Sequence, residues 1–105
     1  MLTPSPQSSD ERGKRWLHAQ VQAILAANAV ALATPGAEGE PSCSWGEGPE
    51  AHTTLYFRLE GDPEPKALQF RRNTIAGCGS GLYSTQRNAV LVIRRMLAKM
   101  GILSA

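Results

Sequence analysis

The stretch from Ile24 to Asn73 decides the fold, and its pieces read ILAANAVALAT (24–34), GAEGEP (36–41), LYF (55–57) and KALQFRRN (66–73). In this order the patterns predict a helix end, a short apolar strand, a glycine-rich turn, an aromatic strand and a helix that opens with a lysine. The order matters because it ends with a cation and free backbone amides at one helix start, where a phosphate group can bind.

Size and composition limit what surrounds this stretch. A chain of 105 residues with 42% hydrophobic residues suits one globular domain with one core. Its net charge of +2 does not by itself indicate nucleic-acid binding. The charge is uneven, because residues 68–105 carry six Lys or Arg and no acidic residue, whereas the charged residues of 37–64 are all acidic except Arg58. This asymmetry suits an anionic ligand, an acidic partner or a second copy of the chain, but also a plain solvated face.

The N-terminal part predicts a disordered tail followed by a long helix. Residues 1–7 are rich in proline and serine, and we expect them to be disordered. Ser8 and Glu11 form a capping-box pattern that starts a helix, which Asn28 ends. The apolar stripe of this helix, at helical spacing, consists of Leu17, Val21, Ile24, Leu25 and the terminal Asn28.

Four segments are predicted as strands of a small antiparallel sheet. Residues 29–34 form a buried strand, and residues 41–45 return beside it as the second arm of a hairpin. Residues 53–59 give the strongest strand pattern, because β-branched and aromatic residues dominate them. Residues 74–78 form a weaker strand that glycines interrupt.

Two further helices complete an α+β fold. Asp62 as N-cap and Pro63 as first helical residue predict a middle helix that runs to about Arg72. Apolar residues at helical spacing predict a C-terminal helix over about 86–100, which Gly101 ends. The run 89–93 also fits a strand, because it is rich in β-branched residues.

Cysteine and histidine usage indicates no chemistry of its own. Cys43 and Cys78 are interpreted as small, reduced core residues. His18 and His52 have no metal-ligating partner at the usual spacing, so no metal site is expected. No apolar signal segment is visible, and we expect a cytoplasmic protein.

The chain resembles the N-terminal half of the pyridoxamine 5′-phosphate oxidase-like split β-barrel family, which binds FMN. The resemblance rests on the order of Val30–Thr34, Glu38–Pro41, Leu55–Phe57 and Lys66–Asn73. It implies that residues 8–105 form one split-barrel-like, incomplete domain that binds FMN across a homodimer and acts as a flavoprotein oxidoreductase. The flavin would supply the hydride chemistry.

Lys66 matches the family's lysine that contacts the flavin phosphate, and the resemblance assigns this role to Lys66 alone. From the residues themselves, Arg58, Arg71 and Arg72 are further candidates for binding the phosphate. The alternative for Lys66 is a solvated helix lysine. No residue has the pattern of an essential acid or base, so no catalytic residue is assigned.

Departures from the family pattern leave other functions open. Glu64 replaces the family's serine or threonine two residues before the lysine, and the later barrel strands cannot be traced after Cys78. We therefore expect a shortened relative, a fragment, or a relative whose tail has been replaced. The alternative function is that of a cofactor-free, degenerate relative that acts as a small homodimeric or partner-binding interaction protein. In that case the C-terminal helix would present an apolar stripe, unless the stripe is core: Ile93, Met96, Leu97 and Met100.

A third possibility is nucleic-acid binding through the basic residues of the same helix. They are Arg87, Arg94, Arg95 and Lys99. Since no DNA- or RNA-binding motif accompanies them, this function is the least favoured of the three.

Overall fold

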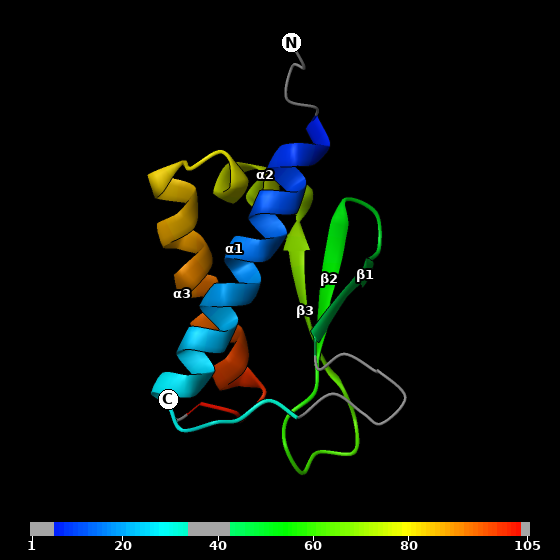
Figure 1. Cartoon of the computed structure of the whole chain (residues 1–105), viewed down its shortest axis with the longest axis vertical. Coiled ribbons are helices and arrows are strands. Elements are labelled where there is room, and N and C mark those ends of the chain that lie inside the picture. Colours follow the sequence, from blue (N-terminus) through cyan, green and yellow to red (C-terminus); the bar gives the residue numbers. More distant parts are fainter. Residues whose placement is uncertain (1–5, 34–42, 104–105) are drawn as a thin grey trace.

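The computed structural model of the chain describes residues 6–33 and 43–103. This part of the chain forms three helices and a three-stranded antiparallel sheet, in the order α1-β1-β2-β3-α2-α3 (Figure 1). The predicted α+β class is confirmed, with an N-terminal, a middle and a C-terminal helix. The sheet is open and does not close into a barrel.

The sheet is a meander in which each strand pairs with its neighbour in sequence. Its strands are β1 (Cys43–Glu47), β2 (His52–Phe57) and β3 (Lys66–Arg71), in the spatial order β1-β2-β3. Leu55 of β2 lies opposite Trp45 on one side and Leu68 on the other, so these side chains share one face. Phe57 and Phe70 extend this apolar face, because residues two apart on a strand point the same way.

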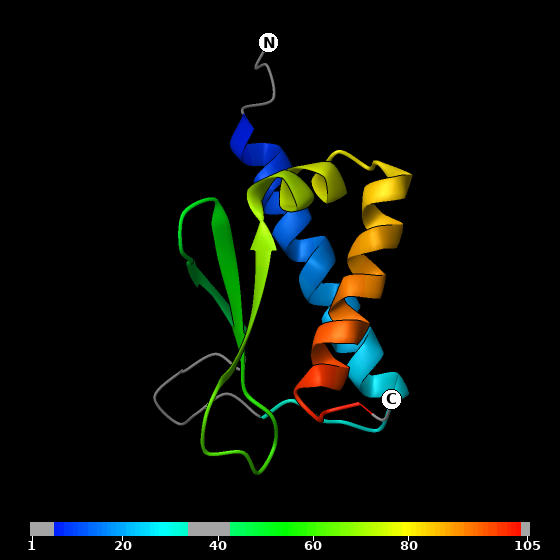
Figure 2. The same ribbon diagram turned by 180° about the vertical axis from the view of Figure 1, so that it is seen from behind.

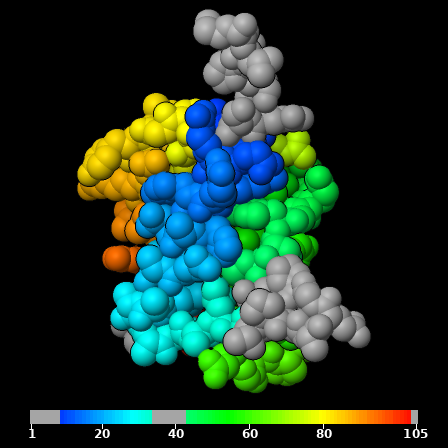
Figure 3. Space-filling view, viewed as in Figure 1, coloured from blue at the N-terminus to red at the C-terminus, as the bar shows by residue number. Residues whose placement is uncertain are grey.

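The helices cover this apolar face of the sheet, and no helix of the described part covers the other face (Figures 1 and 2). The helices are α1 (Pro6–Ala27), α2 (Arg72–Gly79) and α3 (Tyr83–Lys99). α1 crosses α2 at close range, because a methyl group at Gly13 would collide with the Ile75 carbonyl and one at Gly79 with the Ser9 carbonyl. In the space-filling view, α1 lies between α3 and the sheet (Figure 3).

One hydrophobic core fills the space between the helices and the sheet. The largest fully buried side chains are Phe57, Leu17, Leu25, Leu55, Leu68, Ile75, Ile93, Leu97 and Val21. Every helix and two of the strands contribute to this set, so the sheet is stable only with its helices in place.

The two long helices and the central strand confirm the sequence-based predictions. α1 ends near Asn28 as predicted, and the Asn28 amide donates a hydrogen bond of 2.7 Å to the Ile24 carbonyl. α3 begins three residues before the predicted start. Gly101 has a φ of 78°, and the Ile102 amide donates to the Leu97 carbonyl at 3.0 Å, so the helix ends in the expected glycine motif.

The predicted middle helix over residues 62–72 is wrong, because its second half is β3. Leu68 and Phe70 are buried while Ala67 and Gln69 are exposed, which is the period of a strand. The predicted strand over 74–78 is also wrong, because these residues belong to α2. Its glycines are needed for close helix packing, and Gly79 is the example given above.

The predicted first hairpin does not form within the described residues. Residues 30–33 make only a single bridge, Leu32 to Leu59, and β1 pairs with β2 instead. Thr34 and residues 41–42 lie outside the described part. α1 begins at Pro6, so Ser8 is inside the helix and is not its N-cap, and the predicted tail keeps only residues 1–5, which are not described.

Candidate functional site

The four basic residues predicted to hold a flavin phosphate do not form one cluster. Lys66 opens β3 opposite Phe57, and Arg58 follows Phe57 directly, so these two lie at one end of the sheet. Arg71 ends β3 and Arg72 begins α2, at the other end. Over the six residues of β3 this separation is about 17 Å, at a rise of about 3.4 Å per residue.

Lys66 is not at a helix start, which removes the anion site predicted from helical amides beside it. Its ammonium instead lies 3.3 Å from the Asp62 carboxylate, with 35% and 21% of the two side chains exposed. Asp62 also accepts a hydrogen bond of 3.0 Å from the Glu64 amide. This hydrogen bond first, and then Lys66, lower the pKa of Asp62 below its ordinary value. The turn before β3 is thus held by its own charges.

Arg72 lines a cavity of about 430 Å³ between α1, β1 and the start of α2. The other lining residues are Asp10, Lys14, Trp45, Gly46, Glu47, Thr53 and Ile75. Two cations and two carboxylates therefore share the cavity. Arg72 lies 3.7 Å from Glu47, but these side chains are 60% and 91% exposed, so the ion pair adds little stability.

Arg71 lies beside another cavity, of about 380 Å³, between the edge of β3 and α3. His52, opposite Arg71 in the sheet register, also lines it, and its Nδ1 is 3.2 Å from the Pro49 carbonyl. The α3 side of this cavity is formed by Thr85, Asn88, Ala89 and Val92.

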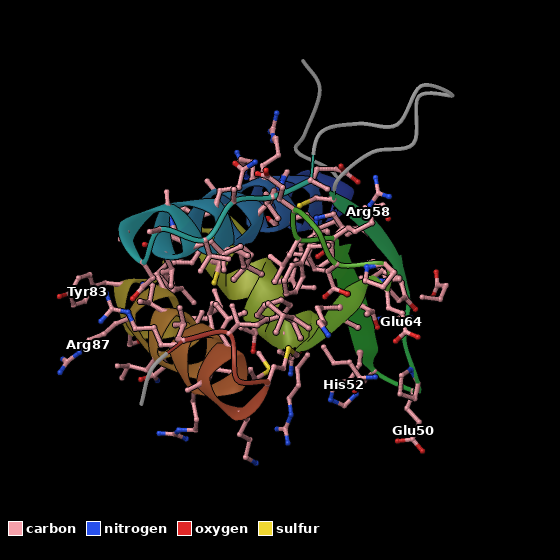
Figure 4. The ribbon with its side chains drawn as sticks, turned by 90° about the horizontal axis from the view of Figure 1, so that it is seen from below. Glu50, His52, Arg58, Glu64, Tyr83 and Arg87 are labelled. Carbon is pink, nitrogen blue, oxygen red and sulfur yellow. The ribbon has the colours of Figure 1, made fainter. Side chains whose placement is uncertain are left out.

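A groove of about 330 Å³ lies between α1 and α3. Its lining, which we call the α1–α3 groove, consists of Trp16, Tyr83, Gln86, Arg87, Val90 and Leu91. Tyr83 is 76% and Leu91 51% exposed, so large apolar side chains stand at its rim. Tyr83 and Arg87 project outward on the same side of α3 (Figure 4).

The face of α3 that the sequence offered to a partner is buried instead. Ile93 and Leu97 are fully buried in the core, and Met96 packs against it. Only Met100 of that stripe is exposed. The outward face carries Leu91 and Val92, which the sequence analysis did not single out. The sequence did contain a signal for this face: Leu91 is two positions from Ile93, and two residues so spaced on a helix cannot both face the core.

The outward side of α3 is also the basic side of the molecule. Its exposed cations are Arg87, Arg94, Arg95 and Lys99. The ion pairs found among the described residues, Lys66–Asp62 and Arg72–Glu47, do not involve them. Glu50 and Glu64 lie on the opposite side of the molecule from Arg87 (Figure 4). The charge asymmetry of the sequence is therefore an asymmetry of the folded domain.

The two cysteines are structural. Cys78 is buried in the core and Cys43 is half-buried at its edge. Burial raises the pKa of both thiols, that of Cys78 to about 11. In the described part of the chain, no group of three or more His, Cys, Asp or Glu residues is placed to hold a metal ion.

No family model, curated protein or solved structure matches the chain. None of the described helices has the length and apolar character needed to cross a membrane. The function has therefore to be inferred from the geometry of the described residues.

Proposed function

We propose that the protein is a small interaction domain that binds a partner protein through the outward side of α3. The observation that carries this proposal is the distribution of exposed apolar side chains. Among the described residues six large hydrophobic residues are exposed, and all except Tyr56 lie on α3 or its caps. They are Leu82, Tyr83, Leu91, Val92 and Met100.

Leu82 and Met100 lie at opposite ends of α3, but Tyr83 and Leu91 border one groove. These two favour a docking surface, because scattered single apolar residues need no explanation but a local group does. We call the residues at its centre the docking face: Tyr83, Arg87, Leu91 and Arg95. Tyrosine and arginine are enriched where proteins bind each other, because each combines a large contact area with hydrogen bonding. Full burial of a leucine side chain contributes about 2 kcal/mol, so covering the exposed half of Leu91 adds about 1 kcal/mol.

Site-specific photo-crosslinking tests the proposal. A photoreactive p-benzoyl-phenylalanine replaces Leu91, and in a matched control it replaces Ser44, which is exposed on β1, away from α3. In cells that normally make the protein, we expect a discrete adduct from position 91 and none from position 44. An excess of the parent protein, without the photoreactive residue, should suppress the adduct by competition, and an excess of the Leu91→Asp variant should not. Absence of an adduct at position 91, or equal adducts at both positions, would refute the proposal.

A second copy of the chain is a less suitable partner for this face. In a twofold dimer each docking face would meet itself, which places Arg87 and Arg95 near the same residues of the other copy. Like charges in such a contact are repulsive. The homodimer that the family resemblance implied stays a prediction for some other surface, and light scattering of the purified protein measures it.

FMN binding is a second proposal, favoured by one feature of the cavity at Arg72. Lys14 and Arg72 line it together with the aromatic ring of Trp45, which suits a phosphate and a flat ring system. Asp10 and Glu47 in the same lining oppose an anion. A visible spectrum of the protein as purified, followed by FMN titration, tests this proposal.

Two variants locate any flavin site. If FMN binds in the cavity, Arg72→Gln weakens binding and Lys66→Gln does not. The family resemblance predicts the reverse, because it assigns the phosphate to Lys66. A colourless protein that FMN does not affect would contradict both.

A further inference from the structure

We propose, on the basis of the interaction function above, that the partner segment is an acidic amphipathic helix. Its apolar anchor enters the α1–α3 groove between Trp16 and Leu91, and its carboxylates lie against the cations of α3.

The groove has the shape and chemistry for an anchor side chain. At about 330 Å³ it is near the lower limit of pockets that bind small molecules, roughly 300–1,000 Å³, and it lies open between two helices. Trp16 and Val90 belong to the partly buried layer over the core, so the groove rests on a packed base. An apolar groove between helices is a known mode of binding an amphipathic helix, which inserts residues from one side.

The cations continue from the groove along α3. Arg87 lines the groove, and Arg94, Arg95 and Lys99 follow on exposed positions. From Arg87 to Lys99 the helix rises about 18 Å, at 1.5 Å per residue. Residues 68–105 contain no acidic residue, so α3 supplies no carboxylate to these cations. A partner helix of similar length, with glutamate or aspartate on one side, complements both the charge and the extent of this row.

Other anionic surfaces fit less well. A nucleic-acid backbone would pair with the arginines, but it offers nothing apolar to Leu91 and Val92. A membrane-bound helix has its apolar and basic residues on separate faces, whereas here Leu91 lies between Arg87 and Arg95 on one exposed side. Glu50 and Glu64 of a second copy lie on the side away from its own α3, so contacts through them would join copies head to tail rather than as a twofold dimer.

The test measures binding of a fluorescent synthetic helical peptide to the full chain by anisotropy. The peptide carries leucines at i, i+3 and i+7 and glutamates on the flanking positions. One control peptide has the same composition in scrambled order, and another has glutamine in place of glutamate. We expect binding of the first peptide only, and weaker binding when NaCl is raised from about 50 to about 500 mM.

Variants of the chain assign the contacts. We expect Arg94→Gln with Arg95→Gln to weaken peptide binding about tenfold or more. Arg72→Gln, an exposed control beside a cavity that no residue of α3 lines, should leave binding unchanged. Leu91→Asn should weaken binding by a similar factor while the variant stays folded, with a melting temperature lowered by about 5–10 °C, since Leu91 is half exposed.

The outcomes separate this inference from the interaction function. No peptide binding, equal binding of the scrambled peptide, or an equal effect of Arg72→Gln would overturn the acidic helix. If the crosslink at position 91 still forms in that case, the interaction function stands with a different partner. If the crosslink is also absent, both fall. The inference is also overturned if the peptide does not bind but duplex DNA or phosphatidylglycerol vesicles do, and this binding is lost in the same arginine variant.

Discussion

Alanine substitutions at Ile93 and Leu91 test the orientation of α3, on which the docking face depends. Ile93 is 0% exposed and Leu91 is 51% exposed. Two residues apart on a helix of 3.6 residues per turn, they point in nearly opposite directions. If the structure is right, the same kind of truncation has unequal effects at these positions.

The magnitudes follow from burial. Ile93→Ala removes three buried carbon atoms and leaves a cavity, so we expect a loss of about 3–4 kcal/mol in the free energy of unfolding. Leu91→Ala loses about half of a leucine's transfer free energy, about 1 kcal/mol. The higher helix propensity of alanine recovers about 0.2 kcal/mol of this. Against a total of about 5–15 kcal/mol for a natural domain, only the first change is large.

Urea denaturation followed by circular dichroism measures both values. With an m-value of about 1.5 kcal/mol/M, the midpoint should fall by about 2 M for Ile93→Ala and by about 0.5 M for Leu91→Ala. Ile93→Val, with an expected loss of about 1 kcal/mol, keeps the comparison measurable if the alanine variant does not fold. Equal losses at the two positions, or a larger loss at Leu91, would show that α3 packs on the other face and would remove the docking face.

Four further predictions concern helix packing, the charge of Asp62, and the reactivity and pH dependence of the Cys78 thiol. Gly79→Ala should destabilise the domain by about 2 kcal/mol or more, because the new methyl group meets the Ser9 carbonyl at the α1–α2 crossing. At Gly81 nothing lies within 4 Å, so Gly81→Ala should cost only the about 1–2 kcal/mol that an alanine needs to adopt a positive φ. Comparison of the two unfolding curves measures the difference. Because the pKa of Asp62 is lower in the folded state than the unfolded value near 3.8, its carboxylate should stabilise the fold above pH 3.8, and this stabilisation should be lost as pH falls through the folded pKa. NMR titration of Asp62 in the parent and in Lys66→Gln measures the shift, and an unchanged pKa in the variant would argue against the ion pair. A Cys78 pKa near 11 rather than 9.0 lowers its thiolate fraction about 100-fold at neutral pH, so Ellman's reagent should modify Cys43 first, and equal rates would contradict the burial of Cys78. The same raised pKa contributes stability that is fully present below pH 9 and is lost as pH rises toward 11. Unfolding curves of the parent and of Cys78→Ala between these pH values measure this loss.

Sequence patterns identified the elements whose local preference and tertiary role agree. The stripe Leu17–Leu25 and the alternating pair Leu55 and Phe57 each match the side that the fold buries, so α1 and β2 were predicted correctly. The failure at Lys66–Arg71 has a physical reason. Asp62 and Pro63 form a good helix start, and the residues that follow tolerate a helix, but burial of Leu68 and Phe70 beside Leu55 decides for a strand.

The candidate site was less accessible to sequence reasoning. Both sides of α3 carry apolar residues, and periodicity alone does not say whether Ile93 or Leu91 faces the core. The α1–α3 groove joins Trp16 to Leu91, which are far apart in sequence, so it exists only once α1 and α3 are packed. The four predicted phosphate-binding cations lie in two pairs at opposite ends of the sheet, as the pairing register of β2 and β3 requires. The sequence could not predict this separation, because residues 66–71 were assigned to a helix.

The close crossing of α1 and α2 has a consequence for biosynthesis. α1 leaves the ribosome well before α2, because the whole sheet is translated between them. Its apolar stripe therefore stays without its partner until Gly79 has been added to the nascent chain. During that interval the emerging polypeptide is a natural client for chaperones that hold hydrophobic segments, and docking of the helices is a late event of its maturation.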